Sequence, residues 1–200
     1  ELFNKYIEKM KRITGEGKIG KTRLYTSVDT WGVQAEYIRH GLNYYQWYDN
    51  VQKILKELPL TKVTVMCTTN LLSIPNFYHL VDDIYPLKEH FYSNDRRVPI
   101  TLDMAILRHP VHQSAIILPP EYANMMESAL NFMLTHAETH SNPYKGFFDF
   151  EIEKMKRFID YVKAIGNLII NTYNYQLAEF ESITCLYPFG YINVYYPNSK

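Results

Sequence analysis

The segment LYTSVDTWGVQAEYIRHG, residues 24–41, decides the fold of this chain. Its apolar and β-branched start predicts a buried strand that ends at Ser27 and Asp29. A turn at residues 31–32 then leads into a helix that carries Arg39. A hydroxyl, a carboxylate and a guanidinium therefore gather near one strand end, which is where open and closed α/β folds place their ligands.

Hydrophobic periodicity extends this pattern on both sides of the segment. Residues 62–68, KVTVMCT, are apolar and β-branched without clean alternation, as expected for a strand covered on both faces. Strands that alternate with helices are most simply parallel neighbours joined by right-handed crossovers. The predicted strands are 22–28, 62–68 and 99–107. Helices are predicted at 2–13 and 76–91. Between the first two strands we expect a further helix, which is capped by Asp29 or Thr30, bends or breaks at Gly41 and ends at Pro59.

Helical patterns alone fill the second half of the chain. The predicted helices cover 122–133 and 148–166, and residues 167–200 fit either short strands or an irregular tail. We therefore expect an α/β fold in residues 1–110, either a partial βα barrel or a small parallel sheet of about three strands with flanking helices. A helical C-terminal region, residues 111–200, should pack with it as one compact unit.

Composition narrows the class of protein. Lys plus Arg and Asp plus Glu each number 21, so no bulk field attracts nucleic acid or an anionic membrane. The apolar runs are too short to span a bilayer, and a cytoplasmic protein is the expectation. The two cysteines, Cys67 and Cys185, are too few for a disulfide-stapled scaffold or for an iron–sulfur cluster, which takes three or four thiolates.

Residues 15–22, GEGKIGKT, match the P-loop pattern GxxxxGK[ST]. A P-loop needs a strand before it and a helix after it, so that the helix N-terminus faces the phosphates. Here a helix precedes the loop and a strand follows it, which favours a flexible surface loop. Nucleotide binding through Lys21 stays open as an alternative.

Two pairs of histidines suggest a metal site but supply too few ligands for one. His109 and His112 lie close in sequence, and His136 and His140 are spaced to share a helix face. A zinc site needs a third or fourth ligand, which the sequence does not identify, so surface or helix-end histidines are the simpler interpretation. Cys67 lies within an apolar strand, where a thiol is usually buried and inert.

The remaining candidates are polar residues expected at the carboxyl ends of the strands. Ser27 and Asp29 could simply cap a helix, with Arg39 neutralising Asp29 or Glu36. Asn70 follows the second strand. Arg108 follows the third strand and would project from the same rim, where its guanidinium can clamp a carboxylate.

At these residues the chain resembles radical S-adenosylmethionine (radical SAM) proteins of the twitch-domain type, over residues 22–133. The most specific segment is TSVDTWGVQAEYIRHG, and weaker matches follow in the expected order. These are NYYQWYDNV, VTVMCTTNLLSIPNF and DMAILRHPVHQSAIILPPEY, with GFFDFEIEKMKRF similar to the next helix of the family.

The resemblance implies a partial βα barrel in which a CxxxCxxC loop holds a [4Fe–4S] cluster that cleaves S-adenosylmethionine. It implies that Ser27 and Arg39 contact the methionyl moiety with Asp29 nearby, and that Asn70 and Arg108 line the barrel mouth. No CxxxCxxC occurs here.

We therefore expect a C-terminal portion of such an enzyme, catalytically silent alone and binding neither cofactor tightly. Its exposed barrel edges would favour self-association or pairing with the missing half. A non-catalytic ligand-binding or interaction module on the same scaffold is the alternative. The sequence does not identify the small-molecule or peptide substrate.

Overall fold

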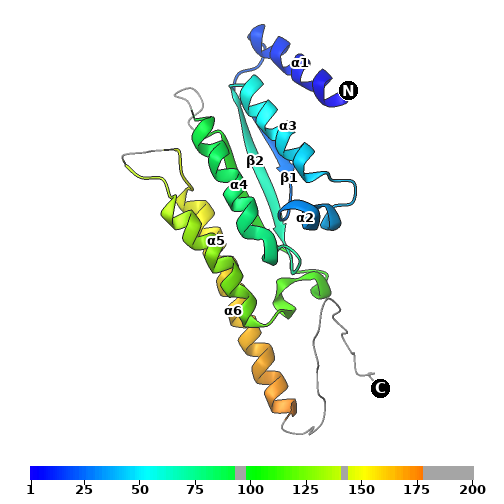
Figure 1. The fold of residues 1–200 in the computed structure, drawn as a ribbon, viewed down its shortest axis with the longest axis vertical. Helices are drawn as coiled ribbons and strands as arrows, with labels where there is room; N and C mark the ends of the chain where they lie inside the picture. Colours follow the sequence, from blue (N-terminus) through cyan, green and yellow to red (C-terminus); the bar gives the residue numbers. More distant parts are fainter. Residues whose placement is uncertain (93–97, 141–143, 178–200) are drawn as a thin grey trace.

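The computed structural model describes residues 1–92, 98–140 and 144–177, and of these the side chains up to residue 164. It is an α/β fold, as predicted, built on a three-stranded sheet with flanking helices (Figure 1). The elements in chain order are α1 (Leu2–Gly15), β1 (Thr22–Ser27), α2 (Gly32–Ile38), α3 (Tyr44–Glu57), β2 (Thr61–Thr69), α4 (Phe77–His90), β3 (Ile100–Ile106), α5 (Ala123–Thr135) and α6 (Asp149–Leu177), with short 3₁₀ turns before α4 and between β3 and α5.

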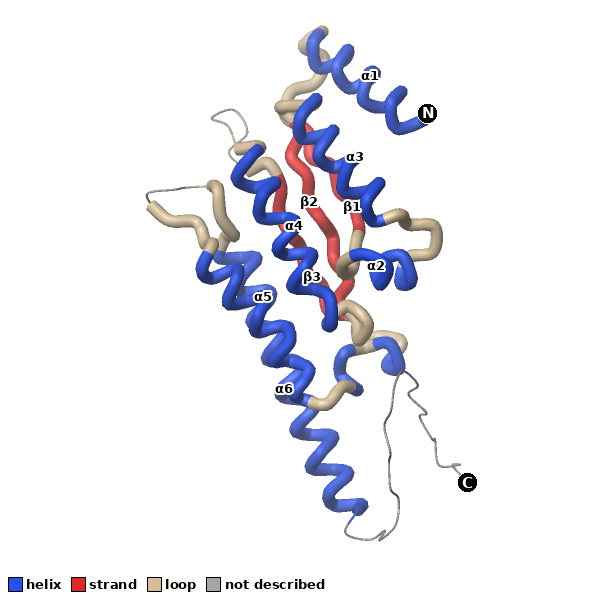
Figure 2. The backbone as a smooth tube through the Cα atoms, in the orientation of Figure 1, coloured by secondary structure: helices blue, strands red, loops and turns tan. Residues whose placement is uncertain are grey.

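The three strands are parallel and follow one another across the sheet in the order β1-β2-β3. Figure 2 shows α3 and α4 in front of this sheet, so its opposite face points away from the viewer. On the helix side, Val63, Val65 and Leu102 are buried in the core. The sequential order is the order of strands in a βα barrel, whereas an open doubly wound sheet reverses its order at a switch point.

The opposite face of the sheet differs from the prediction that the second strand is covered on both sides. Lys62, Met66 and Thr68 of β2 point to that face and are only partly buried. On β1 the exposed positions alternate with partly buried ones, as in a strand covered on one face. The described part of the chain therefore presents one polar sheet face.

The predicted long second helix is two helices, α2 and α3. Gly41 stands between them with φ of +84°, a conformation that favours glycine, so the predicted break is confirmed. Asn43 caps α3 by accepting a hydrogen bond from the backbone N–H of Gln46 at 2.8 Å. The predicted cap of α2 is wrong, because α2 begins at Gly32, beyond Asp29 and Thr30, with Trp31 at its N-cap.

The last two helices, α5 and α6, pack against each other, and α5 also packs on α4. The predicted end of α6 near Gly166 is wrong, since the helix continues to Leu177. One glycine costs a helix interior only about 1 kcal/mol, which the rest of a long helix outweighs. Residues 178–200, including Cys185, lie outside the described residues. In the described part of the chain, no helix combines the length and the hydropathy needed to cross a membrane.

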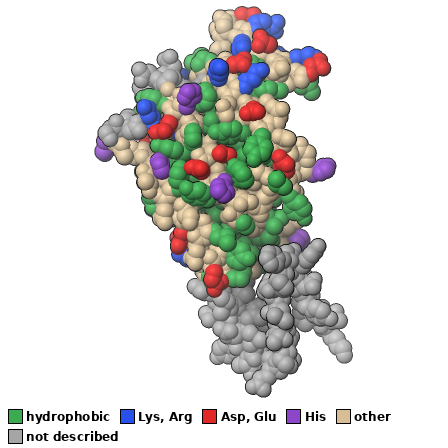
Figure 3. Space-filling model, viewed as in Figure 1, with side chains coloured by type: hydrophobic (Ala, Val, Ile, Leu, Met, Phe, Trp, Pro, Cys, Tyr) green, Lys and Arg blue, Asp and Glu red, His purple; other side chains and the backbone are tan. Residues whose placement is uncertain are grey.

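The solvent-facing surface of the helical layer carries apolar as well as polar side chains. Figure 3 shows apolar side chains interspersed with acidic and histidine side chains over this layer, while Lys, Arg, Asp and Glu gather around α1. Val33, Tyr37 and Tyr45 are prominent among the exposed large apolar side chains. Single exposed apolar residues are normal for a folded domain.

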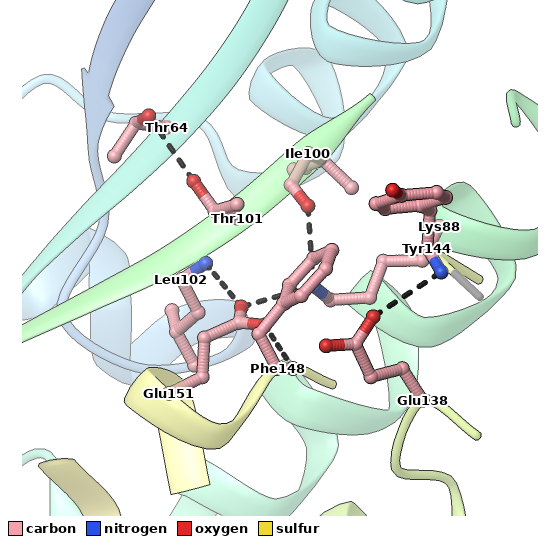
Figure 4. Close-up of polar contacts among 9 residues, drawn as sticks. All are labelled: Thr64, Lys88, Ile100, Thr101, Leu102, Glu138, Tyr144, Phe148 and Glu151. Atoms are coloured by element: carbon pink, nitrogen blue, oxygen red, sulfur yellow. Dashed lines mark hydrogen bonds and ion pairs between the residues drawn. The ribbon is translucent and has the colours of Figure 1, made fainter. Parts of the chain in front are cut away.

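A buried ion pair joins α4, β3 and α6 behind this layer (Figure 4). Lys88 Nζ lies 2.9 and 2.8 Å from the two carboxylate oxygens of Glu151, and it also donates to the carbonyl of Ile100 at 3.1 Å. The same carboxylate accepts hydrogen bonds from the backbone N–H groups of Leu102 and Phe148, at 2.7 and 2.8 Å. Glu151 therefore covers a backbone donor on the β3 edge while neutralising Lys88.

Candidate functional site

The predicted site residues all follow the carboxyl end of a strand or of α2. Ser27 is the last residue of β1, Asn70 follows β2, and Arg108 lies two residues beyond β3. Because the strands are parallel neighbours, their carboxyl ends share one edge of the sheet, which we call the rim. Arg39, the residue after α2, returns to the rim and contacts Asp29.

In the described part of the chain, Asp29 and Arg39 are the only two of these five residues whose side chains are joined by a hydrogen bond or an ion pair. Asp29 is 3% exposed, and its Oδ1 accepts hydrogen bonds from Arg39 Nη2 at 3.0 Å and from the backbone N–H of Thr68 at 2.7 Å. Arg39 Nε lies 2.8 Å from Asp29 Oδ2 without the alignment of a hydrogen bond. The carboxylate thus ties together the ends of β1, β2 and α2.

Asp29 holds the Arg39 guanidinium in position, but the surrounding residues do not bury it. The Arg39 side chain is 36% exposed, whereas the Asp29 side chain is buried. A fixed, half-exposed guanidinium can donate hydrogen bonds to a carboxylate or phosphate that reaches the rim.

Asn70 has a structural role. Its side-chain amide donates to the carbonyl of Thr68 at 3.2 Å, and its side-chain oxygen accepts from the backbone N–H of Leu72 at 2.9 Å. Its own backbone N–H donates to the hydroxyl of Ser73 at 3.1 Å. These bonds build the turn after β2 and occupy the polar atoms that would face a ligand.

Ser27 and Arg108 are exposed at the rim. The described contacts join neither of them to the Asp29–Arg39 pair. Their side chains are therefore accessible from solvent.

Sequence reasoning missed an aromatic cluster beside the rim, formed by Trp31, Tyr44 and His79 around Asp83. The Asp83 carboxylate accepts hydrogen bonds from the Trp31 indole N–H at 2.8 Å and from the Tyr44 hydroxyl at 2.9 Å. Burial, together with the Asp83 charge, raises the pKa of Tyr44 well above its ordinary range. The His79 ring lies 5.1 Å from the Trp31 ring. Asp83 fixes the turn that precedes α2, although in sequence it is an ordinary acidic residue of an amphipathic helix.

Cys67 does not belong to a site. Its thiol is buried on the helix side of β2 and donates to the carbonyl of Val28 at 2.7 Å. Burial, and secondarily the Asp29 charge, raises the pKa of the Cys67 thiol well above its ordinary value. The burial of the Cys67 thiol, predicted from the sequence, is confirmed.

We expect iodoacetamide to leave Cys67 unmodified in the folded protein, because only an accessible thiolate reacts. The measurement is mass spectrometry of a Cys185→Ser variant, in which Cys67 is the sole thiol, treated with and without urea. Modification should require unfolding. Equal rates of modification in the native and urea-treated samples would contradict this placement of the thiol.

The described histidines do not form a metal centre. Across residues 1–92, 98–140 and 144–177, no three His, Cys, Asp or Glu side chains are placed to hold a metal ion together. His136 lies at the end of α5, beyond its last residue Thr135, so the prediction that His136 and His140 share a helix face is wrong. The His136 ring instead packs 4.3 Å from Tyr85 and 4.2 Å from Phe132.

The P-loop-like segment, residues 15–22, connects the end of α1 to the start of β1. The order is therefore helix, loop, strand. No helix N-terminus follows the loop to direct backbone N–H groups at a phosphate.

The fold and the rim define this chain as an α/β protein with three sequential parallel strands and a paired arginine at their carboxyl edge. Comparison with protein-family models, with curated proteins and with solved structures gives no match in any of the three.

Proposed function

We propose that this chain is the C-terminal portion of a radical SAM enzyme and supplies part of the S-adenosylmethionine and substrate pocket. One observation carries the proposal: sequential parallel strands, covered by helices on one face, end at a rim where Asp29 holds a half-exposed Arg39. Ligands of βα folds bind at the carboxyl ends of the strands.

The residues at the rim suit the methionyl moiety of S-adenosylmethionine. The Arg39 guanidinium would donate hydrogen bonds to its carboxylate, while Asp29 holds the guanidinium in position. The exposed hydroxyl of Ser27 would bind a second polar group of the same moiety. Arg108 would face the substrate, and Asn70 would shape the loop between them.

The residues of this chain do not fit the [4Fe–4S] cluster. Cys67 is buried on the helix side of β2 with its thiol bonded to a carbonyl, and the only other cysteine of the 200 residues is Cys185. A cluster takes three or four thiolates. In this proposal the cluster belongs to sequence outside the chain, and the chain by itself is catalytically silent.

Calorimetry with S-adenosylmethionine tests the rim directly. We expect weak binding that Arg39→Lys reduces about tenfold, because lysine keeps the charge beside Asp29 but loses the planar fork. Ser27→Ala should weaken binding less. Arg12→Lys, an exposed arginine of α1 beside Glu16, is the matched control. Binding that Arg39→Lys leaves unchanged would count against the rim as the cofactor site.

The coding sequence that adjoins this segment tests the rest of the proposal. We expect it to encode a CxxxCxxC motif in the same reading frame. An adjoining reading frame without that motif would contradict the enzyme proposal. The remaining hypothesis would then be a non-catalytic module that binds its ligand at the same rim without iron. Tight binding of S-adenosylmethionine by the isolated chain would favour that module.

Two further parts of the proposal concern partners and nucleotides. The exposed edges of the sheet would pair with the remainder of the barrel or with a second copy of the chain. Nucleotide binding at residues 15–22 is less supported, because the loop follows a helix and precedes a strand. If it occurs, Lys21→Ala should abolish ATP or GTP binding.

A further inference from the structure

The open face of the sheet carries its side chains in rows, because the three strands are in parallel register. Arg23 of β1 is the register partner of Lys62 of β2. The next row is formed by Tyr25, Thr64 and Thr101. These rows lie at the amino-terminal half of the strands, at the opposite end from the rim that holds Arg39.

The first row places two cations side by side. Like charges on neighbouring strands destabilise a sheet unless an opposite charge compensates them. Among the described side chains, no carboxylate forms an ion pair with Arg23 or Lys62. Burial, followed by the charges of Arg23 and Lys21, lowers the pKa of Lys62. This row is therefore a local positive charge in a chain of zero net charge.

Among the described strand residues on this face, the one carboxylate already has a partner. Asp103 of β3 forms an ion pair with Lys154 of α6. This pair carries no net charge, so it neither neutralises the first row nor adds to its positive charge. An anion entering here would find its counter-charges already in place.

An open pocket of about 350 Å³ lies over these rows, and its walls are aromatic as well as basic. Tyr25 and Phe150 line it while 60% and 46% exposed. Phe148, also in the lining, stacks on Phe150 with the ring centres 5.9 Å apart. Thr64 and Thr101 also line the pocket, and their hydroxyls are bonded to each other at 3.1 Å (Figure 4).

We propose that this pocket binds a small anion that carries a flat ring, such as a nucleoside monophosphate, with its phosphate on Arg23 and Lys62 and its ring against Tyr25 and Phe150. Cations and aromatic faces are the groups that recognise the two parts of such a ligand. The volume suits one small molecule, at the lower end of ligand pockets. The inference does not rest on the proposed function, because S-adenosylmethionine would bind at the rim and carries a sulfonium cation that this row repels.

Calorimetry with adenosine 5′-monophosphate, adenosine and inorganic phosphate tests the proposal on the full chain. We expect the monophosphate to bind more tightly than either part alone. Arg23→Gln and Lys62→Gln should each weaken its binding about tenfold, since a hydrogen bond to a charged group is worth that much. Tyr25→Leu should weaken the binding of the monophosphate but not the binding of inorganic phosphate.

Lys53→Gln is the matched control, because Lys53 lies on α3 on the opposite side of the sheet and pairs with Glu57. Thermal unfolding gives a second measurement. Without ligand, Lys62→Gln should raise the melting temperature by relieving repulsion from Arg23, and a given concentration of the monophosphate should then raise it less than in the original chain. Adenosine binding as tightly as the monophosphate would overturn the assignment of the cations. Binding unaffected by Arg23→Gln and Lys62→Gln, or no binding at all, would overturn the site.

Discussion

We expect Lys88→Met to lower the free energy of unfolding by about 3–5 kcal/mol, because it leaves the Glu151 carboxylate buried without its cation. Both side chains of the pair are almost fully buried, at 1% and 0% exposed. Burial lowers the pKa of Lys88, and the Glu151 carboxylate opposes that shift. Solvent cannot replace the lost partner at this depth, so the cost is far above that of a surface ion pair.

The double variant Lys88→Met/Glu151→Gln separates the buried charge from the rest of the site. No buried charge remains in it, and the glutamine oxygen can still accept one of the two backbone N–H groups that Glu151 holds, those of Leu102 and Phe148. We therefore expect the double variant to be more stable than Lys88→Met and less stable than the original chain.

Urea unfolding followed by circular dichroism measures both changes. Lys156→Met is the matched control, because Lys156 pairs with Glu153 on the exposed side of the same helix α6. That substitution should change the free energy of unfolding by less than about 0.5 kcal/mol. A double variant no more stable than Lys88→Met would show that the loss comes from packing rather than from an unpaired carboxylate.

Asp29→Ala should cost about 2–3 kcal/mol, the second-largest loss expected. It removes the acceptor of the Thr68 backbone N–H and the partner of Arg39 at one step. The Arg39 part of this loss is reduced, because a side chain 36% exposed can turn to water. Asp29→Asn keeps an oxygen for Thr68 and should cost roughly half as much.

Urea unfolding of both Asp29 variants gives these values, with Asp160→Ala on the exposed side of α6 as the control. The same two variants also test the rim, because each removes the carboxylate that positions Arg39. Equal stability of Asp29→Ala and Asp160→Ala would mean that Asp29 does not tie the strand ends together.

The strands and most helix limits follow from the sequence alone because their signals are local. The apolar run 62–68 lies within β2, and the proline pair 119–120 precedes α5. Gly41 separates α2 from α3 through its own backbone angle, and a backbone angle is a property of one residue. The predicted end at Gly166 was wrong for the same kind of reason: the local cost of one glycine is small beside the rest of a long helix.

The candidate site was predicted in part. The parallel order of the strands was enough to place Ser27, Asp29 and Arg108 at one end of the sheet. Which of these residues touch depended on side-chain geometry, and only Asp29 and Arg39 are joined in the described part of the chain. The Asn70 side chain forms hydrogen bonds within the turn after β2, and its residue type alone did not predict this.

The sequence by itself determined the α/β class, the alternation of strands and helices, and the position of polar side chains at the rim. These features follow from hydrophobic periodicity and strand direction, which local residue patterns reveal. Only the tertiary structure decided the buried pair of Lys88 and Glu151, the polar row of Arg23 and Lys62, and the cluster around Asp83. Each of these joins residues far apart in sequence, which in their own helices or strands look like ordinary surface charges. Their neighbours across the fold exist only once the elements pack together.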